Sequence, residues 1–257
     1  LDFNDAAQHI FPNLTRENIG HYLSALAPEL EPYLTSENIS KNNPLSIQKD
    51  GISRFYEVRK ITINGKQNQK IGIALNIREI TEYHKLLEKL QEYAEKDWLT
   101  GIWNRRKWMD LAMSEINRSK RYRRPLTIVY LDIDHFKSVN DNLGHEGGDM
   151  VLIHLVKNIS SQLRANDIFG RIGGEEFVIL FPELDKENAQ NVTQRLLNTV
   201  SQEEILAYDQ KLKVTISIGA TVWEGEDSKV SLEELIQKAD KALYMSKAAG
   251  RNQATFI

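Results

Sequence analysis

The sequence has 257 residues, of which 41% are hydrophobic and 27% are charged, and its formal net charge is −3. These values are typical of one large or two small globular domains, and they give no reason to expect a nucleic-acid partner, which would call for a basic surface. The absence of cysteine excludes disulfides, thiolate zinc sites and cysteine nucleophiles, and it fits a reducing compartment.

The start of the chain is expected to lie inside a longer protein, because Leu1 is not an initiator methionine and the chain begins in mid-pattern. The sequence has no signal peptide and no stretch of about 18 apolar residues that could span a membrane. We therefore expect a cytoplasmic chain, or the cytoplasmic part of a protein that is attached to a membrane through a missing N-terminal region.

The chain divides by pattern into three zones, which are residues 1–79, 80–96 and 97–257. The first zone combines helical signals over Asn18–Leu30 with strand signals over Arg54–Ile61 and Gln69–Ile77. An Asn-Gly pair, Asn64-Gly65, lies between the two strand signals and predicts a hairpin. The first zone is therefore expected to be a small α+β domain.

The second zone, with its flanks from Arg78 to about Trp98, is predicted to form one helix. Its apolar residues are spaced by three and four positions as in a heptad seam, and they are Ile80, Tyr83, Leu87, Leu90 and Ala94. The run covers only about three heptads. It predicts either a parallel coiled coil that pairs two chains or a helix that packs on its own domain.

The third zone alternates helices and strands. Helices are expected at Arg105–Tyr122, Gly147–Arg164, Lys186–Val200 and Leu232–Ala249, and strands at Leu126–Leu131, Ile168–Ile172, Glu176–Phe181 and Leu212–Trp223. The diglycine Gly173-Gly174 lies between two of these strands and predicts a hairpin, so the sheet should be mixed rather than all parallel. This pattern predicts an α/β (α+β) fold with a mixed central sheet flanked by helices.

Two acidic clusters follow predicted strands of this zone. Asp132 and Asp134 end an apolar strand, although aspartate is a poor strand residue, and Glu175 and Glu176 follow the diglycine. Clustered carboxylates suit Mg²⁺, a hard cation that binds oxygen ligands and substrate phosphates. Each cluster alone is more often an ordinary solvated turn.

Four motifs occur in order in the third zone. They are Asp97-Trp-Leu-Thr-Gly-Ile-Trp-Asn-Arg-Arg106; Asp132-Ile-Asp-His-Phe-Lys137 with Asn140-Asp141 and Gly144-His145-Glu-Gly-Gly-Asp149; Gly173-Gly-Glu-Glu-Phe177; and Ala239-Asp240-Lys-Ala-Leu-Tyr244 with Lys247 and Gly250-Arg251-Asn252. Together they resemble the GGDEF family of diguanylate cyclases, from Asp97 to the C-terminus. The first acid of the signature is Glu175 where the family often has Asp; both occur in active members.

The resemblance implies a nucleotidyl-cyclase (palm-like) fold that condenses two GTP into cyclic di-GMP and two pyrophosphates. Each active site would use two Mg²⁺ ions, for which Mn²⁺ can substitute. The implied metal ligands are Asp132, the backbone carbonyl of Ile133, Glu175 and Glu176, and the implied catalytic residues are Glu175, Glu176 and Lys137. Because each domain binds one GTP, the resemblance also implies a homodimer.

The resemblance further assigns residues that bind the substrate. Asn140 and Asp149 would read guanine, whose Watson–Crick edge offers N–H donors to a carboxylate and to an amide oxygen. Ordinary alternatives are a helix cap for Asn140 and a helix-dipole partner for Asp149. The other implied contacts are Lys137, Lys247 and Arg251 on the triphosphate, together with Phe136, Gly173 and Gly174.

A product-inhibition site is implied by Arg164-Ala-Asn-Asp167, which resembles the family's RxxD site at its usual distance before the signature. Arg195, on the next predicted helix, resembles the secondary arginine of that site. Arginine supplies both a fork for phosphate and a flat face for guanine. By itself RxxD is a common pattern, and the alternative is a surface ion pair.

The first zone resembles the later part of a PAS sensor domain, with Arg54–Ile61 and Ile71–Ile77 as closing strands and Arg78-Glu-Ile-Thr-Glu82 as the exit into a signalling helix. No ligand is indicated. The missing cysteine excludes a flavin–cysteine photosensor, and none of His9, His21 and His84 stands in a context that indicates haem. A dimerising module without a ligand is the alternative.

Two other functions stay open from the sequence. A chain of the same fold could be a non-catalytic receptor that binds cyclic di-GMP through Arg164 and Asp167, although the intact signature favours an enzyme. It could also be a cyclase that makes a single-ring cyclic nucleotide, against which the GGEEF stretch and the guanine-reading pair argue.

Overall fold

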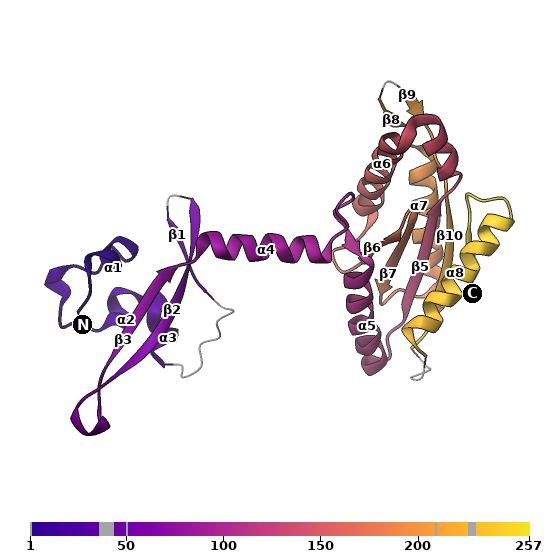
Figure 1. The fold of residues 1–257 in the computed structure, drawn as a ribbon. Coiled ribbons are helices and arrows are strands. Elements are labelled where there is room, and N and C mark those ends of the chain that lie inside the picture. Colours follow the sequence, from indigo (N-terminus) through magenta and orange to yellow (C-terminus); the bar gives the residue numbers. More distant parts are fainter. Residues whose placement is uncertain (1, 36–43, 50, 209, 226–229) are drawn as a thin grey trace. The chain divides into compact units, whose positions relative to one another are not determined.

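The computed structural model describes residues 2–35, 44–49, 51–208, 210–225 and 230–257 (Figure 1). The chain forms two compact units, residues 1–90 and residues 91–257. No helix of the described residues is long and apolar enough to cross a bilayer.

The first unit contains a three-stranded antiparallel sheet in the order β1-β2-β3. Its strands are β1 (Leu45–Lys49), β2 (Ile52–Asn64) and β3 (Lys70–Glu79). The predicted hairpin is confirmed, but its turn is longer than Asn64-Gly65 alone, because the 3-10 helix η3 (Lys66–Asn68) follows the glycine. Gln67 and Asn68 have positive φ, which lets the chain reverse there.

Short helices pack beside this sheet, and three of them lie in or overlap the region Asn18–Leu30 where a short helix region is expected. They are α1 (Asp5–Ile10), η1 (Arg16–Asn18), α2 (Leu23–Leu26), η2 (Pro28–Leu30) and α3 (Glu31–Thr35). Gly20 has φ +98° and Pro28 begins a new turn, so both break the helix. Phe11, Leu30 and Tyr56 belong to the small core. The unit is a small antiparallel sheet with helices, and its identity as a PAS domain stays a prediction.

Helix α4 (Thr81–Glu95) confirms the predicted helix but is shorter at both ends. Strand β3 continues to Glu79, and the Thr81 hydroxyl accepts a hydrogen bond from the Phe55 amide at 3.0 Å, which fixes the start of the helix. Along the seam, Leu87 is 45% and Leu90 is 54% exposed. Both the coiled coil and the helix that packs on its own domain stay predictions.

The second unit is built on a six-stranded mixed sheet in the order β11-β10-β5-β7-β6-β4. The strands are β4 (Trp103–Asn104), β5 (Leu126–Ile133), β6 (Ile168–Gly173), β7 (Glu176–Pro182), β10 (Ile216–Trp223) and β11 (Ala254–Phe256). The four inner strands pair antiparallel, and the short edge strands β4 and β11 pair parallel. The predicted mixed sheet is confirmed.

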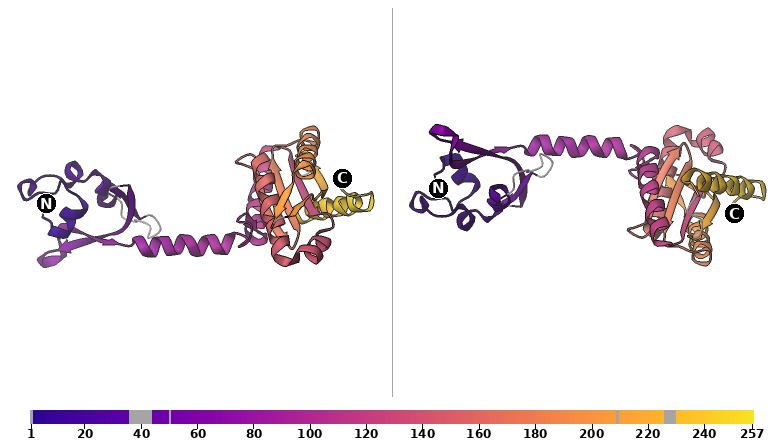
Figure 2. Two further views of the ribbon diagram at one scale, coloured as in Figure 1. Left: turned by 90° about the horizontal axis from the view of Figure 1, so that it is seen from above. Right: turned by 90° about the horizontal axis from the view of Figure 1, so that it is seen from below.

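Helices cover both faces of this sheet, as the two views of Figure 2 show. They are α5 (Arg105–Tyr122), α6 (Phe136–Gln162), α7 (Lys186–Gln202) and α8 (Leu232–Ala248). All eight residues of β5 are buried because alternate side chains enter different cores. Ile128 packs in the core that includes α5 and α8, and Leu131 packs in the core that includes α6 and α7.

Two predicted elements differ from the structure. The helix expected over Gly147–Arg164 begins eleven residues earlier as α6, and Gly144 (φ 73°, ψ 173°) kinks it. The strand expected over Leu212–Trp223 begins only at Ile216, because Leu212 belongs to a separate hairpin. That hairpin consists of β8 (Ile205–Ala207) and β9 (Gln210–Leu212).

Candidate functional site

The pairing of β5 with β7 sets the two acidic clusters side by side. Asp132 is the register partner of Glu176, and Glu175 lies in the turn that leads into β7. Directly opposed residues of an antiparallel pair project to the same face, so these carboxylates share one edge of the sheet. Asp132 is 6% exposed, whereas Glu175 and Glu176 are half-buried.

Lys247, in the last turn of α8, forms an ion pair with the buried acid Asp132. Lys247 Nζ lies 2.8 Å from Asp132 Oδ2. Burial raises the pKa of Asp132 above its usual value, and Glu175 and Glu176 add to this rise, although Lys247 opposes it. Asp132, Glu175 and Glu176 are three acids close to one ammonium, so a bound cation would reduce the repulsion among them.

The residues present suit a hard divalent cation, since they offer carboxylate oxygens at a strand end. Within the described ranges, no three Asp, Glu, His or Cys side chains are already gathered around a common point. The acids would therefore adjust around an ion rather than form a finished cage. Ile133, whose carbonyl is an implied ligand, is the last residue of β5 and is itself buried.

The turn between β6 and β7, at Gly173-Gly174-Glu175, is called the signature turn here, and its two glycines are exposed. Gly174 has φ +48°, and a Cβ placed on Gly173 or Gly174 would meet no atom within 4 Å. A larger residue at either position would therefore not clash with the rest of the chain. The positive φ explains Gly174, and the open space leaves the turn's backbone accessible to a molecule from outside.

The kink in α6 brings the predicted guanine-reading region together. A Cβ on Gly148 would fall 1.9 Å from Asn140 Oδ1, so the Asn140 side chain lies directly against the residue before Asp149. Both Asn140 and Asp149 are half-buried. A straight helix would separate these residues by more than two turns, and Gly144 permits the close approach.

The remaining predicted substrate contacts are distributed around this centre. Lys137 is exposed on the first turn of α6, and Arg251 is exposed on the loop after α8. The Phe136 side chain is buried in the core, which leaves its backbone as the part that could face a ligand. Among the residues that the structure describes, neither Lys137 nor Arg251 forms a hydrogen bond or ion pair with Asp132, Glu175 or Glu176, so their roles stay predictions.

An ion pair that the sequence analysis missed anchors the signature turn. Arg171 Nε donates to the carbonyl of Gly174 at 2.9 Å, and Arg171 Nη1 lies 3.0 Å from Asp97 Oδ1. Burial would raise the pKa of Asp97, but hydrogen bonds from Thr100 and Arg171 outweigh it and hold the pKa below its usual value. Asp97 and Arg171 are 74 residues apart, so no local pattern links them.

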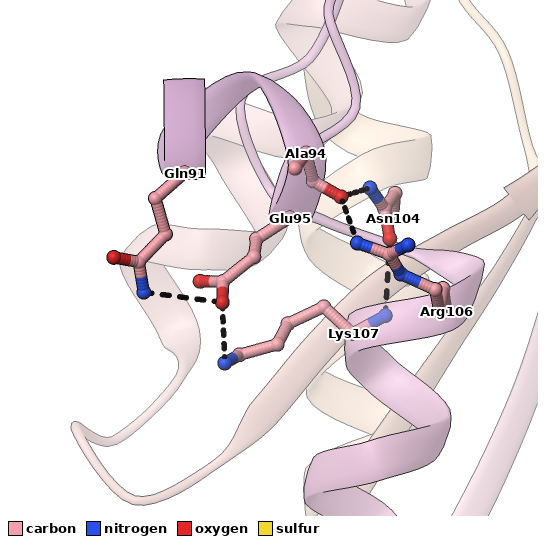
Figure 3. Close-up of polar contacts among 6 residues, drawn as sticks. All are labelled: Gln91, Ala94, Glu95, Asn104, Arg106 and Lys107. Atoms are coloured by element: carbon pink, nitrogen blue, oxygen red, sulfur yellow. Dashed lines mark hydrogen bonds and ion pairs between the residues drawn. The ribbon is translucent and has the colours of Figure 1, made fainter. Parts of the chain in front are cut away.

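The end of α4 is fixed to the start of α5, as Figure 3 shows. The carbonyl of Ala94 accepts hydrogen bonds from Asn104 Nδ2 at 2.9 Å and from the Arg106 guanidinium at 3.2 Å. Lys107 Nζ lies 3.0 Å from Glu95 Oε1, and this hydrogen bond lowers the pKa of Glu95. The last turn of α4 is thus joined to the start of α5 by Asn104 and Arg106 of the first motif and by Lys107.

The predicted inhibitory residues also lie together. Arg164 N donates to Asp167 Oδ2 at 2.7 Å, and Arg195 Nη2 donates to the carbonyl of Gln162 at 3.1 Å. Burial raises the pKa of Asp167, although both arginines are close enough to oppose the rise. A pocket of about 370 Å³ is lined by Arg164 and Asp167 and extends to Trp103.

Comparisons with known proteins assign the second unit to a family. The profile of the family described as "Diguanylate cyclase, GGDEF domain" matches residues 94–253. The chain is 34% identical over 168 residues to the "Probable diguanylate cyclase DgcC" of Escherichia coli K12, a match that covers 64% of this chain and 44% of that protein. It is 30% identical over 233 residues to a "Diguanylate cyclase" of Vibrio cholerae, with 89% of this chain and 70% of that protein covered.

Solved structures show the same fold. The diguanylate cyclase SiaD of Pseudomonas aeruginosa, solved with its activator SiaC, superposes with a TM-score of 0.62 at 34% identity and covers 68% of this chain and 66% of its own. The coiled coil and GGDEF domain of DgcB from Caulobacter crescentus, in complex with c-di-GMP, gives 0.65 at 26% identity, covering 69% and 93%. The chain spans less than half the length of the E. coli relative. By its profile match, its fold and its relatives, the chain belongs to the GGDEF-domain family of diguanylate cyclases.

Proposed function

We propose that this chain is a diguanylate cyclase, which joins two GTP molecules into cyclic di-GMP and releases two pyrophosphates. The observation that carries the proposal is the β5–β7 register, which pairs Asp132 with Glu176 beside the signature turn. An intact acidic pair beside an open turn suits catalysis on a phosphate better than simple binding. Membership of the family supports the same assignment.

The proposed metal ligands are Asp132, Glu175 and Glu176 with the carbonyl of Ile133. Two Mg²⁺ ions, or Mn²⁺ in their place, would supply charge neutralisation on the phosphates and a lower pKa for the attacking hydroxyl. Asp132 brings a carboxylate that burial and neighbouring acids hold at high energy when ionised. That environment favours a bound cation over a free carboxylate.

Lys247 would exchange partners in the working enzyme. It is paired with Asp132 at 2.8 Å here, and its side chain is 34% exposed, so its ammonium can swing outward. We place it, with Lys137 and Arg251, on the triphosphate. Lysine acts as a compact point charge, whereas the arginine fork can bind two phosphate oxygens at once.

Asn140 and Asp149 would select guanine over adenine. The Asp149 carboxylate can accept hydrogen bonds from N1–H and N2–H₂, and the Asn140 amide can both donate and accept. Adenine presents no such pair of donors on that edge. The kink at Gly144 makes this reading possible, because it holds the Asn140 side chain against Gly148.

The reaction would proceed by two equivalent nucleotidyl transfers. The 3′ oxygen of one GTP attacks the α-phosphorus of the other, the new P–O bond forms, and the bond to pyrophosphate breaks. The hydroxyl proton leaves to solvent, and the second transfer closes the ring. Each domain would hold one GTP, so two copies of the chain must face each other, and orientation supplies much of the acceleration.

Two further parts of the proposal concern control. Arg164, Asp167 and Arg195 would bind cyclic di-GMP and hold the domains apart, which limits synthesis when product accumulates. Residues 1–79 would act as a PAS-like sensor, with residues 80–96 as the helical linker to the catalytic domain at 97–257.

Incubation of the purified chain with GTP and Mg²⁺, followed by mass identification of the products, tests the proposal. Cyclic di-GMP and pyrophosphate are expected. Cyclic GMP would indicate a single-ring cyclase instead. No turnover together with tight binding of cyclic di-GMP would identify a receptor and defeat the proposal.

A further inference from the structure

Asp134, the second acid after β5, does not join the first. It is 5% exposed, and both of its carboxylate oxygens accept hydrogen bonds. Ser217 Oγ donates to Oδ1 at 2.6 Å, and Thr215 Oγ1 donates to Oδ2 at 2.7 Å. The backbone amide of Asn252 also donates to Oδ2, at 3.0 Å. Both aspartates follow the same strand, but the Asp134 carboxylate is fully engaged by hydroxyl and amide donors.

The partners of Asp134 are unusual for a buried acid. They are hydroxyl and amide donors, and no ion pair joins Asp134 to a cation in the part of the chain that the structure describes. Burial of a carboxylate is unfavourable unless donors satisfy its oxygens, and these three donors offset that cost. Asp134 thus joins three chain segments: the end of β5, the Thr215–Ser217 segment and the loop at Asn252.

One of those segments carries Arg251. The chain after α8 turns with three successive positive φ angles, at Gly250 (+115°), Arg251 (+66°) and Asn252 (+46°). Such angles are unfavourable for residues other than glycine, so the turn needs support from outside. Two amides supply it, because Arg251 N donates to the carbonyl of Ser246 at 3.0 Å and Asn252 N donates to Asp134.

We propose that Asp134 is a positioning residue that aims Arg251 at the triphosphate of GTP. This inference rests on the proposed function, which places Arg251 on that group. The Arg251 side chain is exposed, while hydrogen bonds from the amides of Arg251 and Asn252 fix the backbone that carries it. The guanidinium can therefore reach a ligand from a backbone of fixed position. Two acids separated by one residue thus have different tasks: Asp132 serves the reacting centre, and Asp134 holds a loop 118 residues farther along the chain.

The test compares three substitutions by steady-state kinetics. Asp134→Ala removes every acceptor and should raise the KM for GTP about tenfold, with a smaller fall in kcat. Asp134→Asn should restore most of the loss, because the amide oxygen can serve Asn252 and Thr215 while its NH₂ donates to the Ser217 hydroxyl. Ser217→Ala is the matched control, since it leaves Oδ2 and Asn252 joined, and its KM should stay within about twofold of wild type.

A double-mutant cycle separates positioning from general damage. If Asp134 acts through Arg251, Asp134→Ala should raise KM in the wild-type background and have no further effect on KM in the Arg251→Ala background. Additive effects of the two substitutions, or an Arg251→Ala variant with wild-type KM, would overturn the inference.

Two controls keep the test independent of folding and of the proposed function. Hydrogen exchange at the Asn252 amide of the unaltered protein should be slow, and exchange at the rate of a free amide would contradict the inference even if Asp134→Ala fails to fold. If the wild-type chain makes no cyclic di-GMP, the proposed function fails alone. The same cycle is then measured as the Kd of a non-hydrolysable GTP analogue with Mg²⁺.

Discussion

Asp132 illustrates, at the scale of the single residue, how this site opposes stability. The residue is buried at a strand end that β-strand propensity alone would not give to aspartate. Burial, with help from Glu175 and Glu176, raises its pKa in spite of Lys247. The ionised Asp132 carboxylate destabilises the protein when no cation is bound, and the same carboxylate can serve as a ligand when a cation binds.

The pH dependence of stability follows from the direction of that shift. A carboxyl whose pKa is higher in the folded chain stabilises the fold fully below its unfolded value near 3.8, and this contribution is lost as the pH rises through the folded pKa. In EDTA at pH 7, Asp132→Asn should therefore raise the Tm by roughly a few degrees. The gain should shrink as the pH falls toward 4; a Tm lowered at pH 7 would contradict this.

Removal of Glu175 tests the metal side of the site. Glu175→Ala should lower cyclic di-GMP synthesis at least about a hundredfold, because it deletes a proposed ligand from a half-buried turn. Circular dichroism and cyclic di-GMP binding should stay at wild-type values. The same change at Glu187, an exposed acid in the first turn of α7, is the matched control and should keep full activity.

Prediction from sequence worked at the residue scale where a local motif carried the signal. Asp132 and Glu175 are expected to converge because an apolar strand and a diglycine turn are local patterns; the structure makes Asp132 the register partner of Glu176, the next residue, and the metal-binding roles stay predictions. Arg171 was missed because its partner Asp97 is 74 residues away. The task of Asp134 was missed for the same reason, since its loop partner is 118 residues away.

At the scale of elements, the hairpin β6–β7 depends on one guanidinium. Arg171 bridges Asp97 and the Gly174 carbonyl, so Arg171→Ala should loosen the signature turn and lower kcat about tenfold or more while the sheet survives. Hydrogen exchange of the 172–176 segment should become faster. Arg121→Ala, on the exposed side of α5, is the matched control, and an unchanged kcat in Arg171→Ala would rule out this role.

The seam of α4 offers a second test at this scale. Leu87 and Leu90 are about half exposed, so Leu87→Asp with Leu90→Asp should dissociate a coiled-coil dimer and lower specific activity at micromolar protein. Lys89→Asp changes the charge outside the seam and should leave the dimer intact. Sedimentation of all variants as monomers, the wild type included, would refute pairing through α4.

Elements were predictable where their period was long and regular. Strand β5 and helices α5, α7 and α8 follow from apolar runs and helical spacing. The first half of α6 was missed because Asn, Asp and Gly crowd residues 140–149 and hide its periodicity. Strands β4 and β11 have two and three residues, and only their neighbours in the folded sheet make them strands.

At the scale of the whole molecule, the account requires two copies of the chain for one product. A site that holds a single GTP cannot close a ring from two, so activity should depend on association, and product bound at a separate surface can oppose it. The Arg164–Asp167 surface is bordered by a pocket whose lining includes none of Asp132, Glu175 and Glu176.

Arg164→Ala tests that surface. The substitution removes a fork for phosphate, so the concentration of cyclic di-GMP that halves the rate should rise at least about tenfold, and progress curves should stay straight for longer. The initial rate should remain near that of wild type. Arg121→Ala serves again as the control, and curves that bend as early as wild type would count against this site.

The central claim is that Asp132 and the acids of the signature turn meet at a metal beside the α-phosphate of GTP. A crystal structure with Mn²⁺ and a non-hydrolysable GTP analogue tests it most directly. Data collected at the manganese absorption edge would show the ions as peaks in an anomalous difference map. The account predicts manganese peaks bound by Asp132 and Glu175, with Lys247 moved to the triphosphate. A structure in which the nucleotide is bound, Lys247 still pairs with Asp132 and manganese lies elsewhere would contradict it.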